Sequence, residues 1–311
     1  MKVSVIMCAY NVSEFIDRAI NSILEQTYQD WELIICDDAS TDNTIELIGK
    51  YLKDERIKLH QQTKNVGYLK NKNYAFTLYS GDLITQLDAD DTCPPDRLEK
   101  QVAVFKNHPE IKICGSNYQQ IDLHDKPLGA TKHQEDFLIS DLKDEYPFWF
   151  PGLIFHKELI DEFGLFSEYF SGIFGDDNYW TIRVNRKYPI YFLKDVLYNY
   201  RINPNSITNV FNNPRKLIVA EIIQKLIEQQ IERNTDWLEE GQQEKLRAYE
   251  KELMSNSNLM AEKYRLWAAK AIDKGDMDQA KMLLGRSLKL QGSNQNTYKT
   301  MLYYLRRKIF K

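Results

Sequence analysis

Apolar runs alternate with helix-like apolar spacings along the first 110 residues. Four short runs have the length and aliphatic composition of buried strands, and they lie at 2–8, 31–36, 57–61 and 83–87. The segments that follow these runs have apolar residues at helical intervals, and they begin near Ser13, Thr41 or Asp42, Gly67 and Pro95. This alternation predicts an α/β fold with a mostly parallel sheet and helices on both faces.

The pattern changes twice in the rest of the chain. Strand-like runs occupy 111–121 and 188–200, and the loop 147–152 carries aromatic rings that we expect to be exposed. From about residue 214 the apolar spacing is helical, and 259–290 resembles one tetratricopeptide-like helix pair. A single pair must pack on a neighbour or a partner, a homo-oligomer included, to bury its apolar face. The sequence therefore predicts an α/β domain at 1–210 and an α-helical region at 211–311.

Charge and composition narrow the classes of protein. The formal net charge of −4 argues against a nucleic-acid binder, which needs an excess of basic residues. No apolar run is long enough for a transmembrane helix, and the N-terminal run is too short for a signal peptide, so we expect a cytoplasmic protein. The four cysteines form no CxxC pair and are expected to be buried free thiols.

Acidic and aromatic residues follow three of the predicted strands. In open parallel sheets, ligands bind beyond the carboxyl ends of the strands. Ala9-Tyr10-Asn11 follows the first strand, Asp37-Asp38 follows the second, and Asp88-Ala89-Asp90-Asp91 follows the strand at 83–87. These turns predict a polar binding site at one edge of the sheet.

Six short motifs, taken in order, carry a resemblance to a known family. They are 3–11, 22–28, 31–44 with its Asp37-Asp38-Ala39-Ser40 turn, Asn65-Val66-Gly67 with Lys72-Asn73, Gly81-Asp82, and 87–91 leading to Pro95. Over residues 1 to about 210 the chain resembles family 2 inverting glycosyltransferases, and among them the spore-coat polysaccharide type. The resemblance implies a GT-A fold, which is Rossmann-like with a mixed, mostly parallel sheet. It also implies a nucleotide-sugar donor, Mn²⁺ or Mg²⁺, inversion at the anomeric carbon, and a saccharide or lipid-linked acceptor.

The resemblance gives the acidic turn at 88–91 two tasks. Divalent metals that hold diphosphates bind through one or two carboxylates plus phosphate oxygens. We assign Asp90 to the metal and Asp88 to the nucleotide, with Asp91 as the alternative for either task. Taken alone, the turn could also be a solvated acidic segment before Pro95.

The nucleotide would lie along the first two strand ends. The resemblance places Ala9 and Tyr10 there, and the Tyr10 ring can stack on the base. Asp38 can accept the imide N–H of uracil, and thymine offers the same group, so uridine is favoured without being fixed. Lys72 is a candidate for reaching a phosphate, and the alternative is an exposed helix lysine.

The second acidic motif is Gly175-Asp176-Asp177-Asn178-Tyr179-Trp180. By resemblance Asp177 is the general base that takes the acceptor proton, and Asp176 helps to bind the acceptor. The alternative is a helix N-terminus stabilised by acidic residues. Asn203 stands where the family often has a histidine that can bind the metal, so the metal site is expected to be less closed here.

Rival functions differ in what they require. A dinucleotide-binding oxidoreductase needs a glycine-rich turn after the first strand, which is absent, and a nucleotidyltransferase needs a glycine-rich basic loop. The Gln-x-x-Arg-Trp pattern of processive synthases is also absent, which favours single additions. A non-catalytic nucleotide-sugar-binding or scaffold protein remains the alternative.

The C-terminal tail 301–311 mixes aromatic, aliphatic and basic residues, and from Gly285 onward seven residues are basic and none is acidic. As a helix, this tail could lie at a membrane interface with its rings among the headgroups. The alternative is a helix packed on the helical region. One hypothesis is therefore peripheral attachment to the inner membrane face.

Overall fold

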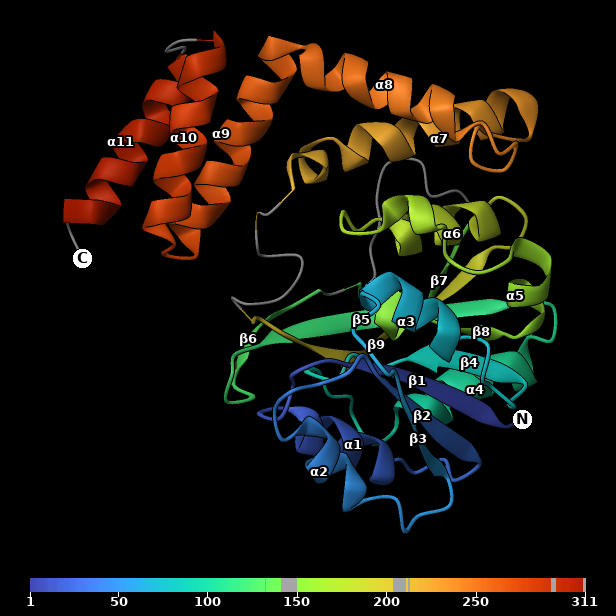
Figure 1. The fold of residues 1–311 in the computed structure, drawn as a ribbon. Coiled ribbons are helices and arrows are strands. Elements are labelled where there is room, and N and C mark those ends of the chain that lie inside the picture. Colours follow the sequence, from blue (N-terminus) through green and yellow to red (C-terminus); the bar gives the residue numbers. More distant parts are fainter. Residues whose placement is uncertain (132, 141–149, 204–210, 212, 292–294, 310–311) are drawn as a thin grey trace. The chain divides into compact units, whose positions relative to one another are not determined.

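The computed structural model describes residues 1–131, 133–140, 150–203, 211, 213–291 and 295–309. The chain forms two compact units (Figure 1). Unit 1 comprises Met1–Ser171 and Asp176–Asn203, and unit 2 comprises Gly172–Gly175 and Pro204–Lys311. The expected boundary at 210–211 stays a prediction, because 204–210 lie outside the described residues.

In the described part of unit 1, nine strands form one sheet in the order β3-β2-β1-β4-β8-β5-β9-β7, with β6 paired to β5. The strands are β1 Val3–Ala9, β2 Trp31–Asp37, β3 Ile57–Gln61, β4 Leu83–Gln86, β5 Ile113–Ile121, β6 Pro127–Ala130, β7 Phe137–Ile139, β8 Ile154–His156 and β9 Ile190–Arg201. β3, β2, β1 and β4 are mutually parallel, as are β5 and β9. β6, β7 and β8 pair antiparallel with their neighbours, so the sheet is mixed.

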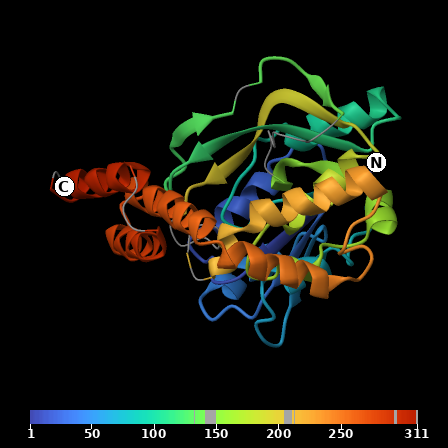
Figure 2. The same ribbon diagram turned by 90° about the horizontal axis from the view of Figure 1, so that it is seen from above.

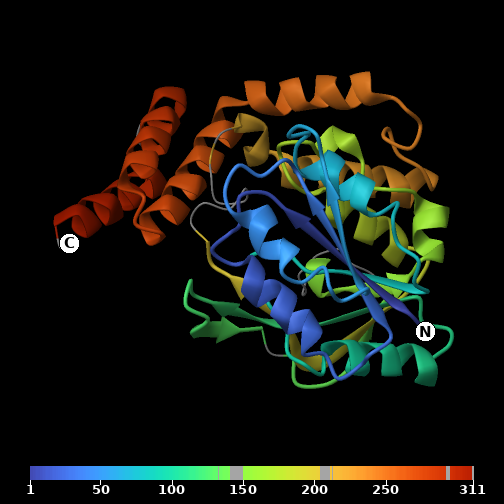
Figure 3. The ribbon, with the colours of Figure 1, turned by 60° about the horizontal axis from the view of Figure 1, so that its bottom comes forward.

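Helices cover both faces of this sheet (Figures 1 and 3). The helices of unit 1 are α1 Ile16–Leu24, α2 Thr44–Gly49, α3 Tyr68–Ala75, α4 Arg97–Asn107, α5 Glu158–Phe163 and α6 Asp176–Asn185, with short 3-10 turns η1 Phe150–Gly152 and η2 Glu168–Phe170. Apolar residues of α1 and α4 pack in one core with the alternate residues Val3, Val5 and Met7 of β1. Helix α3 lies on the opposite face from α1 and α2. The predicted α/β fold class is therefore confirmed.

The predicted cap at Ser13 is wrong, whereas Asp42, one of the two residues predicted to cap the next helix, binds the start of that helix. The side chain of Ser13 caps nothing, and α1 begins at Ile16 after a tight turn in which Val12 accepts from the backbone of Phe15 and Ile16. Instead, the backbone N–H of Ser13 donates to Asp42 Oδ2, at 3.1 Å. Asp42 Oδ1 also accepts from the backbone N–H of Thr44, the first residue of α2, so Asp42 and not Thr41 anchors that end.

Unit 2 is helical. Its helices are η3 Pro214–Leu217, α7 Val219–Arg233, α8 Gln243–Ser255, α9 Ser257–Asp273, α10 Met277–Gln291 and α11 Gln295–Ile309. The expected pair at 259–290 is present as α9 and α10, and α11 lies beside both (Figures 1 and 2). Tyr303 and Tyr304 of α11 pack against a small core of Ala271, Ile272 and Ala280. Among the described residues, no helix combines the length and apolarity needed to cross a bilayer.

The first residues of β1 are held by a buried carboxylate. Glu32 is 1% exposed and accepts from the Ser4 hydroxyl and from the backbone and hydroxyl of Ser80, at 2.6–2.7 Å. Burial alone would raise the pKa of Glu32, but hydrogen bonds from Lys58, Ser4 and Ser80 hold its pKa well below the ordinary value. This network brings the backbone at Gly81 against β1, and the Gly81 N–H donates to Ser4 Oγ at 2.9 Å.

Gly81 should tolerate no side chain. A Cβ there would lie 2.6 Å from the carbonyl oxygen of Lys2 and 2.9 Å from the backbone nitrogen of Ser4, so the backbone would have to move. We expect Gly81→Ala to lower the free energy of unfolding by about 1–3 kcal/mol, the usual cost of overpacking. The measurement is urea unfolding followed by circular dichroism.

Gly49→Ala is the matched control. Gly49 ends α2, and a Cβ there would meet nothing within 4 Å. Alanine is the better helix former by about 1 kcal/mol, so this variant should be as stable as the parent or more stable. Equal destabilisation by both substitutions would contradict the role given to the close contact at Gly81.

Candidate functional site

The register of three strands brings the acidic turns to one edge of the sheet. Cys8 lies opposite Cys36 in the β1–β2 pair, and Ile6 lies opposite Gln86 in the β1–β4 pair. The residues that follow these positions are therefore at nearly the same level. The charges of Asp38, Lys72 and Asp88 all act on the pKa of the half-buried Cys8 thiol, which burial raises first. The structure thus brings together the residues predicted after the first, second and fourth strands.

The turns after β1 and β2 hold each other through backbone and side-chain hydrogen bonds. The Asp38 N–H donates to the Ala9 carbonyl at 2.9 Å, and the Asn11 carboxamide oxygen accepts from the Thr41 N–H at 2.8 Å. Asn11 and Ala39 both have positive φ, of 50° and 60°. Tyr10 is left 47% exposed between these turns, so its ring is available to a planar ligand.

Asp38 organises the loop before α3. Its Oδ1 accepts from the Val66 N–H at 2.7 Å, and its Oδ2 accepts from the Gly67 N–H at 2.9 Å. Gly67 has a φ of 90°, a conformation suited to glycine, and α3 begins at the next residue. The carboxylate is only 3% exposed, but each of its oxygens keeps a second lone pair for a ligand.

Lys72 is buried, which excludes the expected alternative of an exposed helix lysine. It is 1% exposed, and its Nζ forms an ion pair with Asp176 Oδ2 at 2.9 Å. The rings of Phe166, Phe150 and Tyr68 surround the ammonium, at 3.7, 4.6 and 5.7 Å from the ring centroids. Phe150 is buried, so the expectation of an exposed ring is wrong for it, and the loop residues 147–149 lie outside the described residues.

Asp88 and Asp90 lie half-buried in the turn after β4. Burial and then the charge of Asp90 raise the pKa of Asp88 to about 7, although a hydrogen bond from Gln86 and the charge of Lys72 lower it. The Gln86 carboxamide donates to Asp88 Oδ1 at 2.6 Å. Burial also raises the pKa of Asp90. A divalent cation bound between these two carboxylates would offset their mutual repulsion and favour their ionised forms.

Asp91 has structural partners on both oxygens. It is 1% exposed, its Oδ2 accepts from the Tyr198 hydroxyl at 2.6 Å, and its Oδ1 accepts from the Arg201 N–H at 2.6 Å. The Arg201 guanidinium in turn donates to the Asp90 carbonyl at 2.5 Å. Asp91 therefore ties the acidic turn to the end of β9, and the alternative of a ligand role for Asp91 is less favoured.

Asn203 lies beside the residue assigned to the metal. Its side-chain amide donates to Asp90 Oδ2 at 3.3 Å. This contact orients the Asp90 carboxylate beside the end of β9. Among the described residues, no group of three His, Cys, Asp or Glu side chains forms a metal cluster.

The acidic pair Asp176-Asp177 occupies the first turn of α6. Burial raises the pKa of Asp177, the charge of Asp176 raises it further, and Lys72 lowers it. Asp88, Asp176 and Asp177 all contribute to raising the pKa of Tyr68, after burial, so the acids of α6 and of the turn after β4 face one space. A carboxylate of raised pKa therefore lies near the acidic turn after β4, and a raised pKa is a property that a general base can use.

Three structural residues of the site were missed by sequence reasoning. Arg201, Tyr198 and Gln86 each hold an acidic side chain or its backbone, and their contacts to 88–91 span up to 111 residues of chain. No local spacing signals the contacts of Tyr198 and Arg201, whereas Gln86 lies only two residues before Asp88.

Comparisons with known proteins identify the family of this chain. The family model described as glycosyl transferase family 2 matches residues 4–160, half of the chain, and the chain belongs to that family. The putative glycosyltransferase EpsE of Bacillus subtilis is 42% identical over 123 residues, which cover 39% of this chain and 44% of EpsE. The chain thus matches less than half the length of that relative.

Two solved structures share the fold at low sequence identity. TarS residues 1–349 of S. aureus, in complex with UDP-GlcNAc, aligns with a TM-score of 0.62 and 18% identity, covering 99% of this chain and 89% of that one. A mannosyltransferase from Pyrobaculum calidifontis, in complex with GDP-Man and Mn²⁺, aligns with a TM-score of 0.56 and 16% identity, covering 99% and 86%.

Substitutions in the acidic turn should distinguish the structural role of Asp91 from the proposed ligand-binding role of Asp90. Asp91→Ala leaves the Arg201 N–H and the Tyr198 hydroxyl buried without their acceptor, at a cost of about 1–3 kcal/mol for each group. Asp90→Ala removes one of two crowded carboxylates and should not lower stability. Thermal unfolding in the presence of a chelator measures both variants, and a larger loss in Asp90→Ala would contradict the structural role of Asp91.

Proposed function

We propose that this protein is an inverting glycosyltransferase that moves a sugar from a UDP-sugar to a hydroxyl of a saccharide or lipid-linked acceptor. The observation that carries the proposal is the convergence of Asp38, Asp88 and Asp90 with the acidic pair of α6 at one edge of the sheet. Family membership and the fold shared with a UDP-GlcNAc complex support it. Cell-surface polysaccharide synthesis is the proposed setting, by resemblance to the spore-coat type.

The donor would lie across the ends of β1, β2 and β4. Tyr10 stacks on the base, Ala9 lies beneath it, and Asp38 accepts the imide N–H. Asp88 binds the nucleotide, and Asp90, oriented by Asn203, would hold Mn²⁺ or Mg²⁺ together with the diphosphate. The bound ion supplies charge neutralisation for the departing diphosphate. The Mn²⁺ in the P. calidifontis complex supports this cofactor.

The chemical step needs one proton acceptor. Asp177 takes the proton of the acceptor hydroxyl while that oxygen attacks the anomeric carbon from the face opposite the diphosphate. The new carbon–oxygen bond forms as the bond to the diphosphate breaks, which inverts the configuration. Asp176 binds the acceptor, and its ion pair with Lys72 fixes the first turn of α6. In this arrangement Lys72 could bind a donor phosphate only if its ion pair with Asp176 were broken.

If the protein were a non-catalytic nucleotide-sugar-binding or scaffold protein, it would not need Asp177 as a base. Asp177→Asn keeps the shape of the side chain and should bind UDP nearly as the parent does, yet lose about 10²–10⁴-fold in turnover, the usual contribution of a positioned base. Asp161→Asn, at an exposed position of α5, is the control and should keep full activity. Activity is measured as sugar transfer and as donor hydrolysis across a panel of nucleotide sugars. Unchanged turnover in Asp177→Asn would sink the assignment of the base.

The nucleotide site should prefer a pyrimidine. With Mn²⁺ present, UDP should bind more tightly than GDP or ADP in calorimetry, because Asp38 can accept from an N3–H that adenine lacks and the space beside Tyr10 suits a pyrimidine better than a purine. A chelator, or Asp90→Ala, should remove most of this binding, because the diphosphate then loses its counter-charge. Tighter binding of a purine nucleotide would count against Tyr10 and Asp38, whereas metal-independent binding would count against Asp90.

The proposed location is the inner membrane face or the cytoplasm. Contacts of α11 limit which residues of the tail could bind a membrane. The Tyr303 hydroxyl donates to Asp273, and the rings of Tyr303 and Tyr304 pack on α9 and α10. These two rings are therefore engaged within unit 2. The basic residues of α11 and the apolar Leu302 and Leu305 remain exposed, so attachment through the tail stays a hypothesis.

A further inference from the structure

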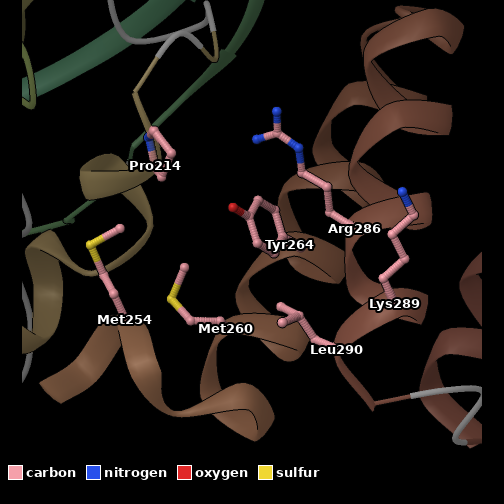
Figure 4. Close-up of a pocket in the computed structure, with 7 residues that line it drawn as sticks. All are labelled: Pro214, Met254, Met260, Tyr264, Arg286, Lys289 and Leu290. Atoms are coloured by element: carbon pink, nitrogen blue, oxygen red, sulfur yellow. The ribbon is translucent and has the colours of Figure 1, made fainter. Parts of the chain in front are cut away.

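Unit 2 contains a pocket far along the chain from the acidic residues of the site. It has a volume of about 320 Å³ and is formed by η3, α8, α9 and α10 (Figure 4). Its lining residues are Pro214, Met254, Met260, Tyr264, Arg286, Lys289 and Leu290. None of them has a role in the proposed reaction, so the pocket needs an explanation of its own.

The pocket is amphipathic. Its surface is largely apolar and is formed by two thioethers, a proline, a leucine and a tyrosine ring. In Figure 4 the cationic ends of Arg286 and Lys289 lie toward one side of the view, and the two methionines and Leu290 lie toward the other. Methionine side chains adapt to irregular apolar ligands. The apolar floor of the pocket, formed by Met254, Met260 and Leu290, therefore suits a flexible hydrocarbon better than a rigid ring.

The two cations have no carboxylate partner within the described residues. Arg286 and Lys289 stand on successive turns of one face of α10, and both are exposed. The Arg286 guanidinium lies against Phe211 and Tyr264, at 5.8 and 5.6 Å from the ring centroids, which keeps it at the pocket. A protein that leaves two neighbouring cations unpaired beside an apolar surface presents a site for an amphipathic anion.

The surrounding sequence has the same charge. From Gly285 to Lys311 the chain carries seven basic residues and no acidic one, in a protein whose net charge is −4. Basic residues near an anionic lipid surface are attracted by its potential, whereas an isolated soluble anion would not need the apolar floor. An acidic peptide would be drawn by the same charge, but a pocket dominated by aliphatic and thioether groups favours a hydrocarbon chain.

We propose that this pocket binds an anionic phospholipid, with its phosphate at Arg286 and Lys289 and the adjoining part of a hydrocarbon chain on Met254, Met260 and Leu290. Unit 2 thereby holds the protein at an anionic membrane surface. The proposal concerns binding alone and does not depend on the proposed transferase activity. It also differs from the tail hypothesis, since it names residues of α8, α9 and α10.

The test is co-sedimentation of the full chain with vesicles of phosphatidylcholine, with and without phosphatidylglycerol. The parent should bind only the vesicles that contain phosphatidylglycerol. Arg286→Gln/Lys289→Gln should weaken this binding by about 30-fold, as expected for two basic residues at an anionic surface. Leu290→Glu is a second variant, which places a carboxylate one turn from Arg286 and should weaken binding without removing a cation.

Two controls carry the same change of charge elsewhere. Arg247→Gln/Lys251→Gln lies on the exposed face of α8, and Arg306→Gln/Lys308→Gln lies on α11. The α8 pair should bind within about threefold of the parent, and the α11 pair should lose less binding than the pocket pair, since neither pair contributes to the pocket. Circular dichroism and thermal unfolding show whether each variant is folded.

Three outcomes would overturn the proposal. Unchanged binding by the folded pocket variants, or a larger loss in the α11 variant, would place the contact elsewhere. Equal binding to pure phosphatidylcholine vesicles would remove the charge requirement. If inorganic phosphate alone protected the pocket, shown as a shift in unfolding temperature that the pocket variants lose, the ligand would be a soluble anion and not a lipid.

Discussion

The hydrogen bonds between the end of β9 and the acidic turn after β4 are the constraint on which the rest of the site depends. Asp91 accepts from Tyr198 and Arg201, and Arg201 donates to the carbonyl of Asp90. Arg201 is itself 1% exposed and reaches Asp125 and the Asp122 carbonyl with its remaining donors. One buried cation therefore joins three segments that are distant in the chain. Without it, like charges at Asp88, Asp90 and Asp91 would drive the turn apart.

Two cations of this site, Arg201 and Lys72, are buried, and their burial is energetically unfavourable by itself. Removing an ion from water is unfavourable unless another charge and full hydrogen bonding compensate it. Arg201 is compensated mainly by carbonyl and carboxylate oxygens, and Lys72 by one carboxylate and a set of aromatic rings. Asp88 is compensated only in part, by a hydrogen bond from Gln86 and by the charge of Lys72, and its raised pKa reflects this.

The sequence pattern was sufficient for much of the fold. The alternation of strand and helix, the position of each turn after β1, β2 and β4, and the α9–α10 pair all follow from local spacing and are present. What the pattern lacked was long-range pairing. The antiparallel insertion of β8 between β4 and β5, and the ion pair of Lys72 with Asp176 across 104 residues, depend on tertiary packing. Lys72 showed no local sign of burial, because helix α3 has only a weak apolar stripe.

Asp38, the loop it binds, α3 and the Lys72–Asp176 pair form one continuous chain of contacts. Asp38 holds Val66 and Gly67, Gly67 opens α3, and Lys72 projects from the second turn of that helix to α6. In a mutational landscape these positions would behave as one epistatic group, in which a change at Asp38 alters the effect of a change at Asp176. Replacements along this chain of contacts would therefore be tolerated best in pairs, with α3 as the shared element.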